Sequence, residues 1–185
     1  MRREYDANLR HELLENCFSY FVKTGLEKVT IKELSENTGI SSGSLYYWFE
    51  DKDKILLEST KYGLNLVVDE LFAYAVSHLD NIQRLLSEFP EKILWYKDEL
   101  RFIYQVTTSK QYGEEMRHLN SELKYTFNKY TVKLAEYLNC NFDLLYPYVN
   151  LVISSILDYV VWEDVDKIRL ELNCIYKSIK SIADV

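Results

Sequence analysis

Residues Gly25 to Leu56 read GLEKVTIKELSENTGISSGSLYYWFEDKDKIL, and this stretch decides the fold. It combines helix starts and helix breaks within a span that fits only a compact helical unit. Gly25 follows an apolar helical pattern and can adopt the left-handed conformation that closes a helix. Thr30 and Glu33 have the spacing of a capping box, in which each side chain bonds the other residue's backbone N–H. The spacing therefore predicts a short helix over 30–38.

A second short helix follows after a tight turn. Gly39 ends the first helix, and Ser41 or Ser42 can cap the next one. In that helix, Leu45 and Phe49 have the i, i+4 spacing of a buried stripe. Two short helices joined by a turn that contains glycine indicate a helix-turn-helix, whose second helix enters the major groove of DNA.

The candidate DNA contacts are small, phenolic or basic side chains on and around this second helix. Small residues allow close approach, phenols can reach a phosphate or a thymine methyl, and lysines neutralise phosphates. The alternative is that they are merely exposed polar residues of a three-helix unit. The candidates are Lys32, Ser42, Gly43, Ser44, Tyr46, Tyr47 and Lys52.

The segment TIKELSENTGISSGSLYYWFEDKDKIL resembles the DNA-binding domain of the TetR/AcrR family of bacterial transcriptional regulators. The matching positions are Thr30, Leu34, Gly39, Ile40, Ser41, Gly43, Leu45, Tyr46, Phe49, Lys52, Asp53 and Leu56. The departures from the family pattern are Ser35, Trp48 and Asp51. The resemblance implies an all-α fold of about nine helices. It also implies a helix-turn-helix domain over 1–50 and an effector-binding and dimerisation domain over 51–185.

The net charge of −7 is unusual for a protein that binds DNA. Residues 1–60 are also acidic overall, with 8 Lys+Arg and 11 Asp+Glu. We therefore expect a narrow basic strip with weak non-specific affinity, formed by Arg2, Arg3, Lys28, Lys32, Lys52 and Lys54. We expect Glu12, Glu15 and Glu36 to lie on faces turned away from it.

Catalytic, metal-binding and membrane-spanning signals are missing from the sequence. The three histidines are scattered, and there is no Gly-rich phosphate loop or nucleophile elbow, so we expect neither an enzyme nor a cofactor. Cys17, Cys140 and Cys174 lack metal-ligand spacing and are expected to be reduced thiols in the cytoplasm. The apolar run 144–162 is interrupted by polar residues, which argues against a membrane span.

Hydrophobic periodicity predicts the remaining helices. The first expected helix covers 6–23, and its apolar stripe, which includes Leu9, packs on Leu34, Leu45 and Phe49. The later helices are expected over 51–77, from Asp80 to about Pro90, and over 91–108, 114–138, 146–162 and 165–182. Pro90 is expected to start a new helix. By resemblance, the helix over 51–77 acts as a lever between the two domains.

The last two expected helices carry apolar surface suited to an interface. The helix over 146–162 is apolar nearly all round. The final helix has a seam at Val165, Ile168, Leu172, Ile175, Ile179 and Ile182, the spacing of a helix packed along another helix. By resemblance, these two helices form a homodimer, which would bind a palindromic double-stranded DNA operator.

Aromatic side chains between residues 95 and 127 fall in the segments that line the effector pocket of family members. The aromatic ones are Trp95, Tyr96, Phe102, Tyr104, Tyr112, Tyr125 and Phe127, the thioether of Met116 falls in the same segments, and each is alternatively a plain core residue. Arg101, Arg117 and His118 could pair with a ligand carboxylate or belong to a solvated face. We hypothesise a repressor released from its operator by a hydrophobic or aromatic small molecule. The alternative is a helical interaction protein of the same fold without tight DNA binding.

Overall fold

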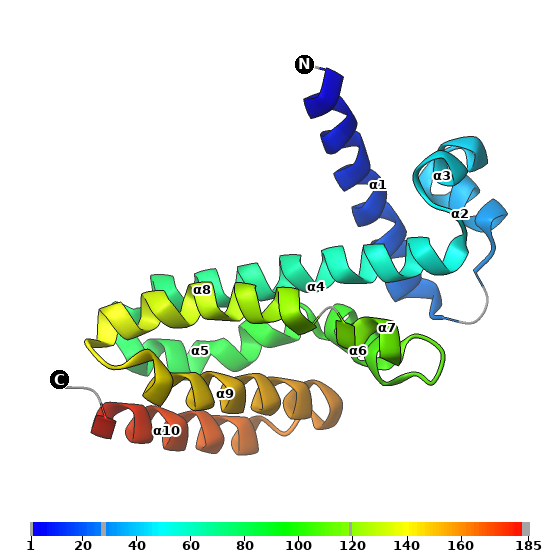
Figure 1. Ribbon diagram of the computed structural model, residues 1–185. Coiled ribbons are helices and arrows are strands. Elements are labelled where there is room, and N and C mark those ends of the chain that lie inside the picture. Colours follow the sequence, from blue (N-terminus) through cyan, green and yellow to red (C-terminus); the bar gives the residue numbers. More distant parts are fainter. Residues whose placement is uncertain (1, 27–28, 119, 183–185) are drawn as a thin grey trace. The chain divides into compact units, whose positions relative to one another are not determined.

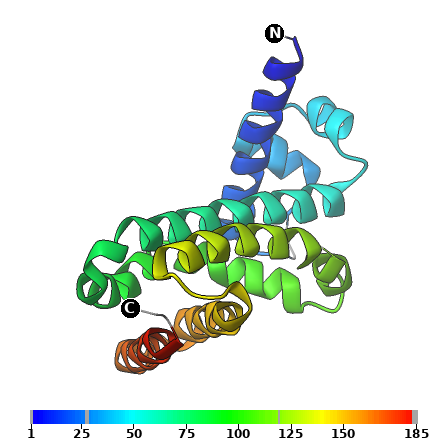
Figure 2. The same cartoon turned by 60° about the vertical axis from the view of Figure 1, so that its left-hand side comes forward.

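The computed structural model describes residues 2–26, 29–118 and 120–182, and the side chains of residues 8–26, 29–118 and 127–181 (Figure 1). Within these ranges it contains ten α-helices, one short 3-10 helix and no strand. The predicted all-α class is therefore confirmed. The rotated view in Figure 2 follows the same succession of helices from blue to red.

The helix bounds agree with most of the expected ranges. The helices are α1 (Arg2–Thr24), α2 (Ile31–Thr38), α3 (Ser42–Trp48), α4 (Lys52–Ser77), η1 (Leu79–Asn81), α5 (Ile82–Leu94), α6 (Lys97–Thr108), α7 (Gly113–His118), α8 (Asn120–Leu138), α9 (Phe142–Trp162) and α10 (Val165–Ile182).

The prediction that Pro90 starts a helix is wrong, because Pro90 lies inside α5. Proline in a helix interior typically costs about 3 kcal/mol. Here Pro90 is buried together with Phe89 and Ile93. Burial of this apolar face stabilises the helix although Pro90 has no N–H to donate a helical hydrogen bond. The break comes later, where the Tyr96 N–H donates to the Ile93 carbonyl at 3.0 Å.

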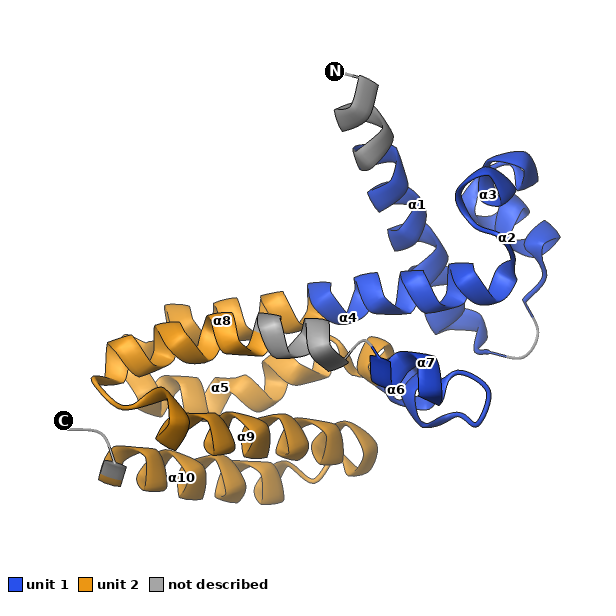
Figure 3. Cartoon of the chain, viewed as in Figure 1, with its two compact units in different colours: residues 1–66, 101–119 blue, residues 67–100, 120–185 orange. Residues whose placement is uncertain are grey.

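The chain forms two compact units, which Figure 3 shows in different colours. Unit 1 contains residues 1–66 and 101–119, and unit 2 contains residues 67–100 and 120–185. Helix α4 contributes its first part to unit 1 and its second part to unit 2. The division into functional domains at residue 50 stays a prediction.

The core of unit 1 joins the first three helices to the start of α4 and to α6 and α7. Its buried members are Leu13, Leu14, Cys17, Phe18, Phe21, Val29, Leu34, Leu45, Phe49, Ile55, Leu56, Leu57, Phe102, Ile103, Val106, Tyr112 and Met116. The predicted packing of the α1 stripe on Leu34, Leu45 and Phe49 is confirmed. The prediction was wrong for Leu9, which is 41% exposed.

The seam of α10 packs along α9 of the same chain in unit 2. Ile168 and Leu172 share a buried cluster with Ile156 and Val160 of α9. Further along, Ile179 shares a second cluster with other α9 residues. The seam is thus confirmed as a helix-packing stripe, except that the Ile182 side chain lies outside the described residues.

Helix α9 is, by length and composition, the one helix in the described ranges that could cross a membrane. The core helix of a soluble protein meets the same criterion, so one such helix is weak evidence for a membrane span. Helix α9 also contributes buried residues to both clusters of unit 2.

Candidate nucleic-acid interface

A capping box starts α2. The Thr30 hydroxyl accepts the Glu33 N–H at 3.2 Å, and Glu33 Oε2 accepts the Thr30 N–H at 2.7 Å. The hydrogen bonds from the Thr30 backbone and side chain lower the pKa of the Glu33 carboxyl below its usual value. The capping box predicted from the sequence is confirmed, and it fixes where the helix-turn-helix begins.

The turn between α2 and α3 has the geometry that the sequence requires. Gly39 has φ of 72°, in the left-handed region that glycine adopts without strain. Ser41 is the cap of α3, because its Oγ accepts the Ser44 N–H at 3.0 Å. Leu45 of α3 is fully buried, and Phe49, which directly follows this helix, is also buried. The turn, the cap and the buried side chains therefore stabilise the packing of the two short helices.

The outer face of α3 presents hydroxyl groups. Tyr46 is 59% exposed and Tyr47 is 80% exposed, while Gly43 and Ser44 are also exposed and Ser42 is half-buried. Such a face can approach a groove closely at its small residues and reach further with its phenols. Next to it, Trp48 is half-buried and packs edge-on against the Tyr47 ring, with centroids 5.2 Å apart.

The basic residues beside α3 differ in their surroundings. Lys32 is exposed, but its ammonium lies 3.8 Å from Glu36, so the expectation that Glu36 turns away from the basic strip is wrong. Lys52 is half-buried and is the first residue of α4. Asp51 Oδ1 accepts the Lys54 N–H at 2.8 Å and so caps this helix start. The side chains of Arg2, Arg3 and Lys28 lie outside the described residues.

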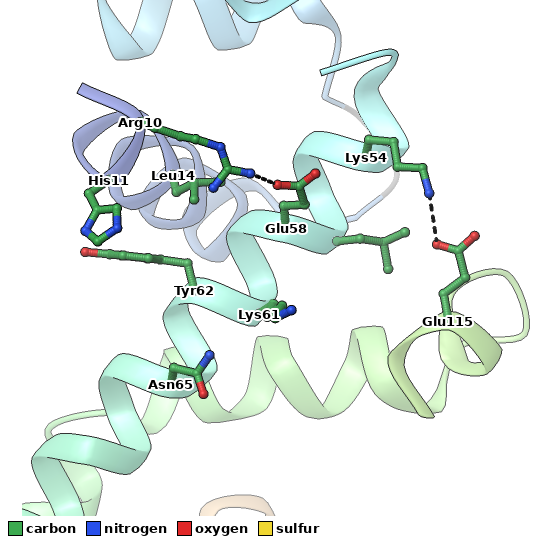
Figure 4. Close-up of a pocket in the computed structure, with 10 residues that line it drawn as sticks. Arg10, His11, Leu14, Lys54, Glu58, Lys61, Tyr62, Asn65 and Glu115 are labelled. Atoms are coloured by element: carbon green, nitrogen blue, oxygen red, sulfur yellow. Dashed lines mark hydrogen bonds and ion pairs between the residues drawn. The ribbon is translucent and has the colours of Figure 1, made fainter. Parts of the chain in front are cut away.

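Side chains of α1 and α4 contact each other around a cavity in unit 1 (Figure 4). Arg10 of α1 points toward Glu58 of α4 and bonds its carboxylate, while its guanidinium lies 5.7 Å from the Phe49 ring centroid. His11 packs edge-on against Tyr62. A cavity of about 440 Å³ lies between them, lined by Arg10, His11, Leu14, Lys54, Leu57, Glu58, Lys61, Tyr62, Asn65 and Glu115.

A second set of contacts connects the α6–α7 segment to the start of α4. The buried Tyr112 hydroxyl donates to Asp53 Oδ1 at 2.9 Å, and Lys54 pairs with Glu115 at 3.8 Å. Burial, together with the hydrogen bond to Asp53, raises the pKa of Tyr112 to about 12. Sequence reasoning missed both sets of contacts, because no local pattern pairs residues so far apart along the chain.

The wild-type protein is expected to be more stable than a Tyr112→Phe variant below pH 10, and this advantage should disappear between pH 10 and pH 12. The pKa of Tyr112 is raised on folding from 10 to about 12, so the folded state holds the phenol proton more tightly. The corresponding stabilisation, about 2–3 kcal/mol for two pKa units, is complete below the unfolded pKa and is lost as the pH passes the folded pKa. Urea unfolding of both proteins at several pH values measures the difference in their free energies of unfolding.

The matched control for this prediction is Tyr137→Phe, which alters an exposed phenol in α8. If the difference between wild type and Tyr112→Phe were the same at pH 9 and pH 12, folding would not raise the pKa of Tyr112.

The structure divides the candidate effector residues between the two units. Phe102, Tyr112 and Met116 are buried in the core of unit 1. Trp95 and Tyr96 belong to unit 2, where both rings face the Lys92 ammonium. The others are Tyr104, which is 45% exposed, Phe127, which packs on Phe72, and Tyr125, whose side chain lies outside the described residues. Their assignment to an effector pocket stays a prediction.

Other chemistry is sparse in the part of the chain that the structure describes. No group of three or more His, Cys, Asp or Glu side chains there could hold a metal ion. Cys17 is buried, and burial raises the pKa of its thiol to about 12. A thiol in this environment behaves as a small core residue. The surface around α3 is therefore the candidate site with the clearest chemistry.

Comparison with known proteins identifies the same region. Residues 13–59 match the family model described as "Bacterial regulatory proteins, tetR family". The solved structure of a TetR family transcription regulator from Marinobacter aquaeolei VT8 superimposes with a TM-score of 0.57 and 18% identity, covering 100% of both chains. This likeness shows that the fold is shared.

Curated relatives are regulators of transcription. The chain is 23% identical to the HTH-type transcriptional repressor AcnR of Corynebacterium efficiens over 152 residues, which is 82% of this chain and 79% of that protein. It is 24% identical to the negative transcriptional regulator IcaR of Staphylococcus epidermidis, over 73% of this chain and 70% of that protein. It is 36% identical to the repressor KstR2 of Mycolicibacterium smegmatis over 52 residues, which is 28% of this chain and 25% of that protein.

Proposed function

Because the chain belongs to the TetR family of bacterial regulatory proteins, we propose that it is a sequence-specific DNA-binding repressor of transcription. The observation that carries this proposal is the exposed hydroxyl face of α3, held on a capped and buried helix-turn-helix. Repression rather than activation is supported by the relatives named as repressors.

Base recognition falls to α3, and phosphate recognition to the start of α4. Helix α3 has no lysine or arginine, so its contacts to base edges come from Ser42, Ser44, Tyr46 and Tyr47. The Lys52 ammonium suits a phosphate at the start of α4, where Asp51 already accepts one of the backbone N–H groups, that of Lys54. With few cations nearby, non-specific affinity is weak and specificity depends on close contact in the groove.

The protein acts as a homodimer that binds a palindromic operator. Support comes from apolar side chains of α9 and α10 that remain exposed in the single chain, including Leu144, Leu151 and Leu170. A surface of this kind is typical of an interface between subunits. In a symmetric dimer the two copies of α3 would lie one DNA turn apart, about 34–36 Å. Such a regulator works in the cytoplasm, where its DNA is.

A hydrophobic or aromatic small molecule releases the repressor from DNA. The candidate contacts are Met116 and the aromatic residues between 95 and 127, of which Trp95 and Tyr96 are accessible to a ligand in unit 2. The ligand must bind more tightly to a conformation with low DNA affinity, and this difference, about 1–3 kcal/mol, sets the regulatory effect. DNA binding must weaken ligand binding by the same factor.

A Lys52→Ala variant is expected to bind duplex DNA with a weaker salt dependence. Loss of one phosphate contact lowers the slope of log affinity against log salt concentration by about one unit. Fluorescence anisotropy with a labelled duplex at several salt concentrations measures the slope. Lys133→Ala, an exposed lysine of α8, is the matched control and should keep the wild-type slope.

The second candidate function is an interaction protein of the same fold without tight DNA binding. The net charge of −7 favours it, since phosphate neutralisation supplies most non-specific affinity. Failure of the wild-type protein to bind duplex DNA even at low salt would favour this alternative. Slopes that are equal for wild type and Lys52→Ala would contradict the assigned phosphate contact.

A further inference from the structure

The ammonium of Lys92 lies over three aromatic rings at once. Its Nζ is 4.4 Å from the ring centroid of Trp95, 5.2 Å from that of Tyr96 and 5.6 Å from that of Tyr74. Tyr74 belongs to α4, Lys92 lies in the last turn of α5, and Trp95 and Tyr96 follow α5 directly. All of these residues belong to unit 2. Each distance lies within the range of a cation–π contact, about 6 Å.

The ammonium takes this position although a carboxylate is available in the same helix. Glu88 precedes Lys92 by four residues, the spacing and order that favour an ion pair on a helix. Glu88 instead accepts from Arg84 Nε at 3.0 Å and from the Tyr74 hydroxyl at 3.1 Å. The rings therefore provide a cation site of their own.

The tyrosine hydroxyls strengthen this site. The Tyr74 hydroxyl donates to Glu88, and the Tyr96 hydroxyl donates to Glu70 Oε2 at 3.4 Å. A phenol that donates to a carboxylate becomes richer in electrons, which makes the face of its ring more attractive to a cation. The Glu70 carboxylate also adds negative charge close to the rings, whereas the charge of Glu88 is balanced by Arg84.

The site is open to a soluble ligand. Trp95 is 67% exposed, and Tyr74, Lys92 and Tyr96 are half-buried. Lys92 reaches the rings on a flexible stem, so its ammonium can move into solvent when another cation arrives. Departure of Lys92 would leave three ring faces directed at one position, the arrangement that recognises quaternary ammonium groups.

We propose that Tyr74, Trp95 and Tyr96 form a binding site for a quaternary ammonium group, and that the Lys92 ammonium occupies this site when no ligand is bound. A primary ammonium is strongly hydrated and loses more on leaving water than a quaternary one, which has no N–H group to satisfy. The external cation therefore competes well with Lys92. The inference assigns a quaternary ammonium group to the effector, a feature that the proposed function does not specify, and its regulatory meaning rests on that proposed function.

The test uses choline as the cation and 3,3-dimethylbutan-1-ol as its uncharged isostere. A Lys92→Met variant keeps the apolar stem but removes the built-in competitor. Calorimetric titration should show choline binding to Lys92→Met about fivefold or more tighter than to the wild type. The uncharged isostere should bind neither protein measurably.

Two further variants separate the aromatic site from a general surface effect. Trp95→Leu in the Lys92→Met background should abolish choline binding. Tyr137→Leu in the same background removes an exposed aromatic ring of α8 and should leave binding unchanged. The proposal is overturned if Lys92→Met binds choline no better than the wild type, or if it binds the uncharged isostere equally well.

Binding of duplex DNA by the same proteins distinguishes this proposal from the proposed function. Intact DNA binding without choline binding would overturn the cation site alone. Choline binding by a protein that binds no DNA would overturn the repressor function and leave the cation site in place.

Discussion

Replacing Gly63 with alanine is expected to lower the free energy of unfolding by about 1–3 kcal/mol, the usual cost of overpacking a core. A Cβ at this position of α4 would lie 2.3 Å from Cε1 and Cζ of Phe18. Phe18 is only 5% exposed and packs edge-on against Phe102, so its ring has little room to move. The close approach of α1 and α4 depends on the missing side chain.

Urea unfolding of two further proteins sharpens this prediction. Gly43→Ala is the matched control, since its Cβ would meet only Ser41 Oγ at 3.9 Å, and it should be neutral or stabilising. In a Phe18→Ala background the effect of Gly63→Ala should reverse, because alanine favours a helix by about 1 kcal/mol over glycine. An equally destabilising Gly63→Ala change in both backgrounds would show that the Phe18 ring is not the cause.

Replacing Tyr47 with alanine is expected to weaken specific DNA binding at least tenfold. A side chain that reaches a base edge typically contributes about 1–3 kcal/mol, and tenfold corresponds to about 1.4 kcal/mol. Tyr47 is 80% exposed, so its loss should leave the fold unchanged. Affinity for a selected duplex, measured together with the thermal unfolding midpoint, separates a lost contact from a damaged fold.

Tyr137→Ala is the control for this substitution, because it removes another exposed phenol from a helix of unit 2. Equal affinities of wild type, Tyr47→Ala and Tyr137→Ala would mean that α3 does not contact bases through this side chain. A lowered unfolding midpoint for Tyr47→Ala would contradict its placement on an exposed face.

The helix-turn-helix could be predicted because its determinants are local. Thr30 and Glu33, and likewise Ser41 and Ser44, bond across a single helical turn, so the residue types alone predict the caps. The position of Pro90 could not be predicted, because the preference of proline for the start of a helix is outweighed by burial of the surrounding α5 face. This burial depends on neighbours distant in sequence.

The contacts of Arg10 with Glu58 and of Tyr112 with Asp53 could not be predicted, because they too depend on neighbours distant in sequence. Arg10 bonds Glu58 and Tyr112 bonds Asp53 only because α1, α4 and the α6–α7 segment pack in one particular register. A single sequence does not encode that register in any local pattern. Aromatic composition alone also does not separate a buried core residue such as Phe102 from an exposed one such as Trp95.

The cation site depends both on local spacing in the sequence and on the packing of elements distant in sequence. Lys92, Trp95 and Tyr96 have the i, i+3, i+4 spacing of neighbours on one helix face, which the sequence contains. The contribution of Tyr74 depends on the packing of α4 against α5, where Tyr74 also stacks with Phe89. The site was therefore recognisable only once the two helices were placed together.

Selection of bound sequences from random duplex DNA, at moderate and at higher salt, tests the central claim most directly. The account predicts enrichment of a palindrome whose half-sites are one helical turn apart, about 34–36 Å, and its persistence at higher salt. Folded, dimeric protein that enriches no sequence at either salt concentration would contradict the assignment of α3 as a DNA-reading helix.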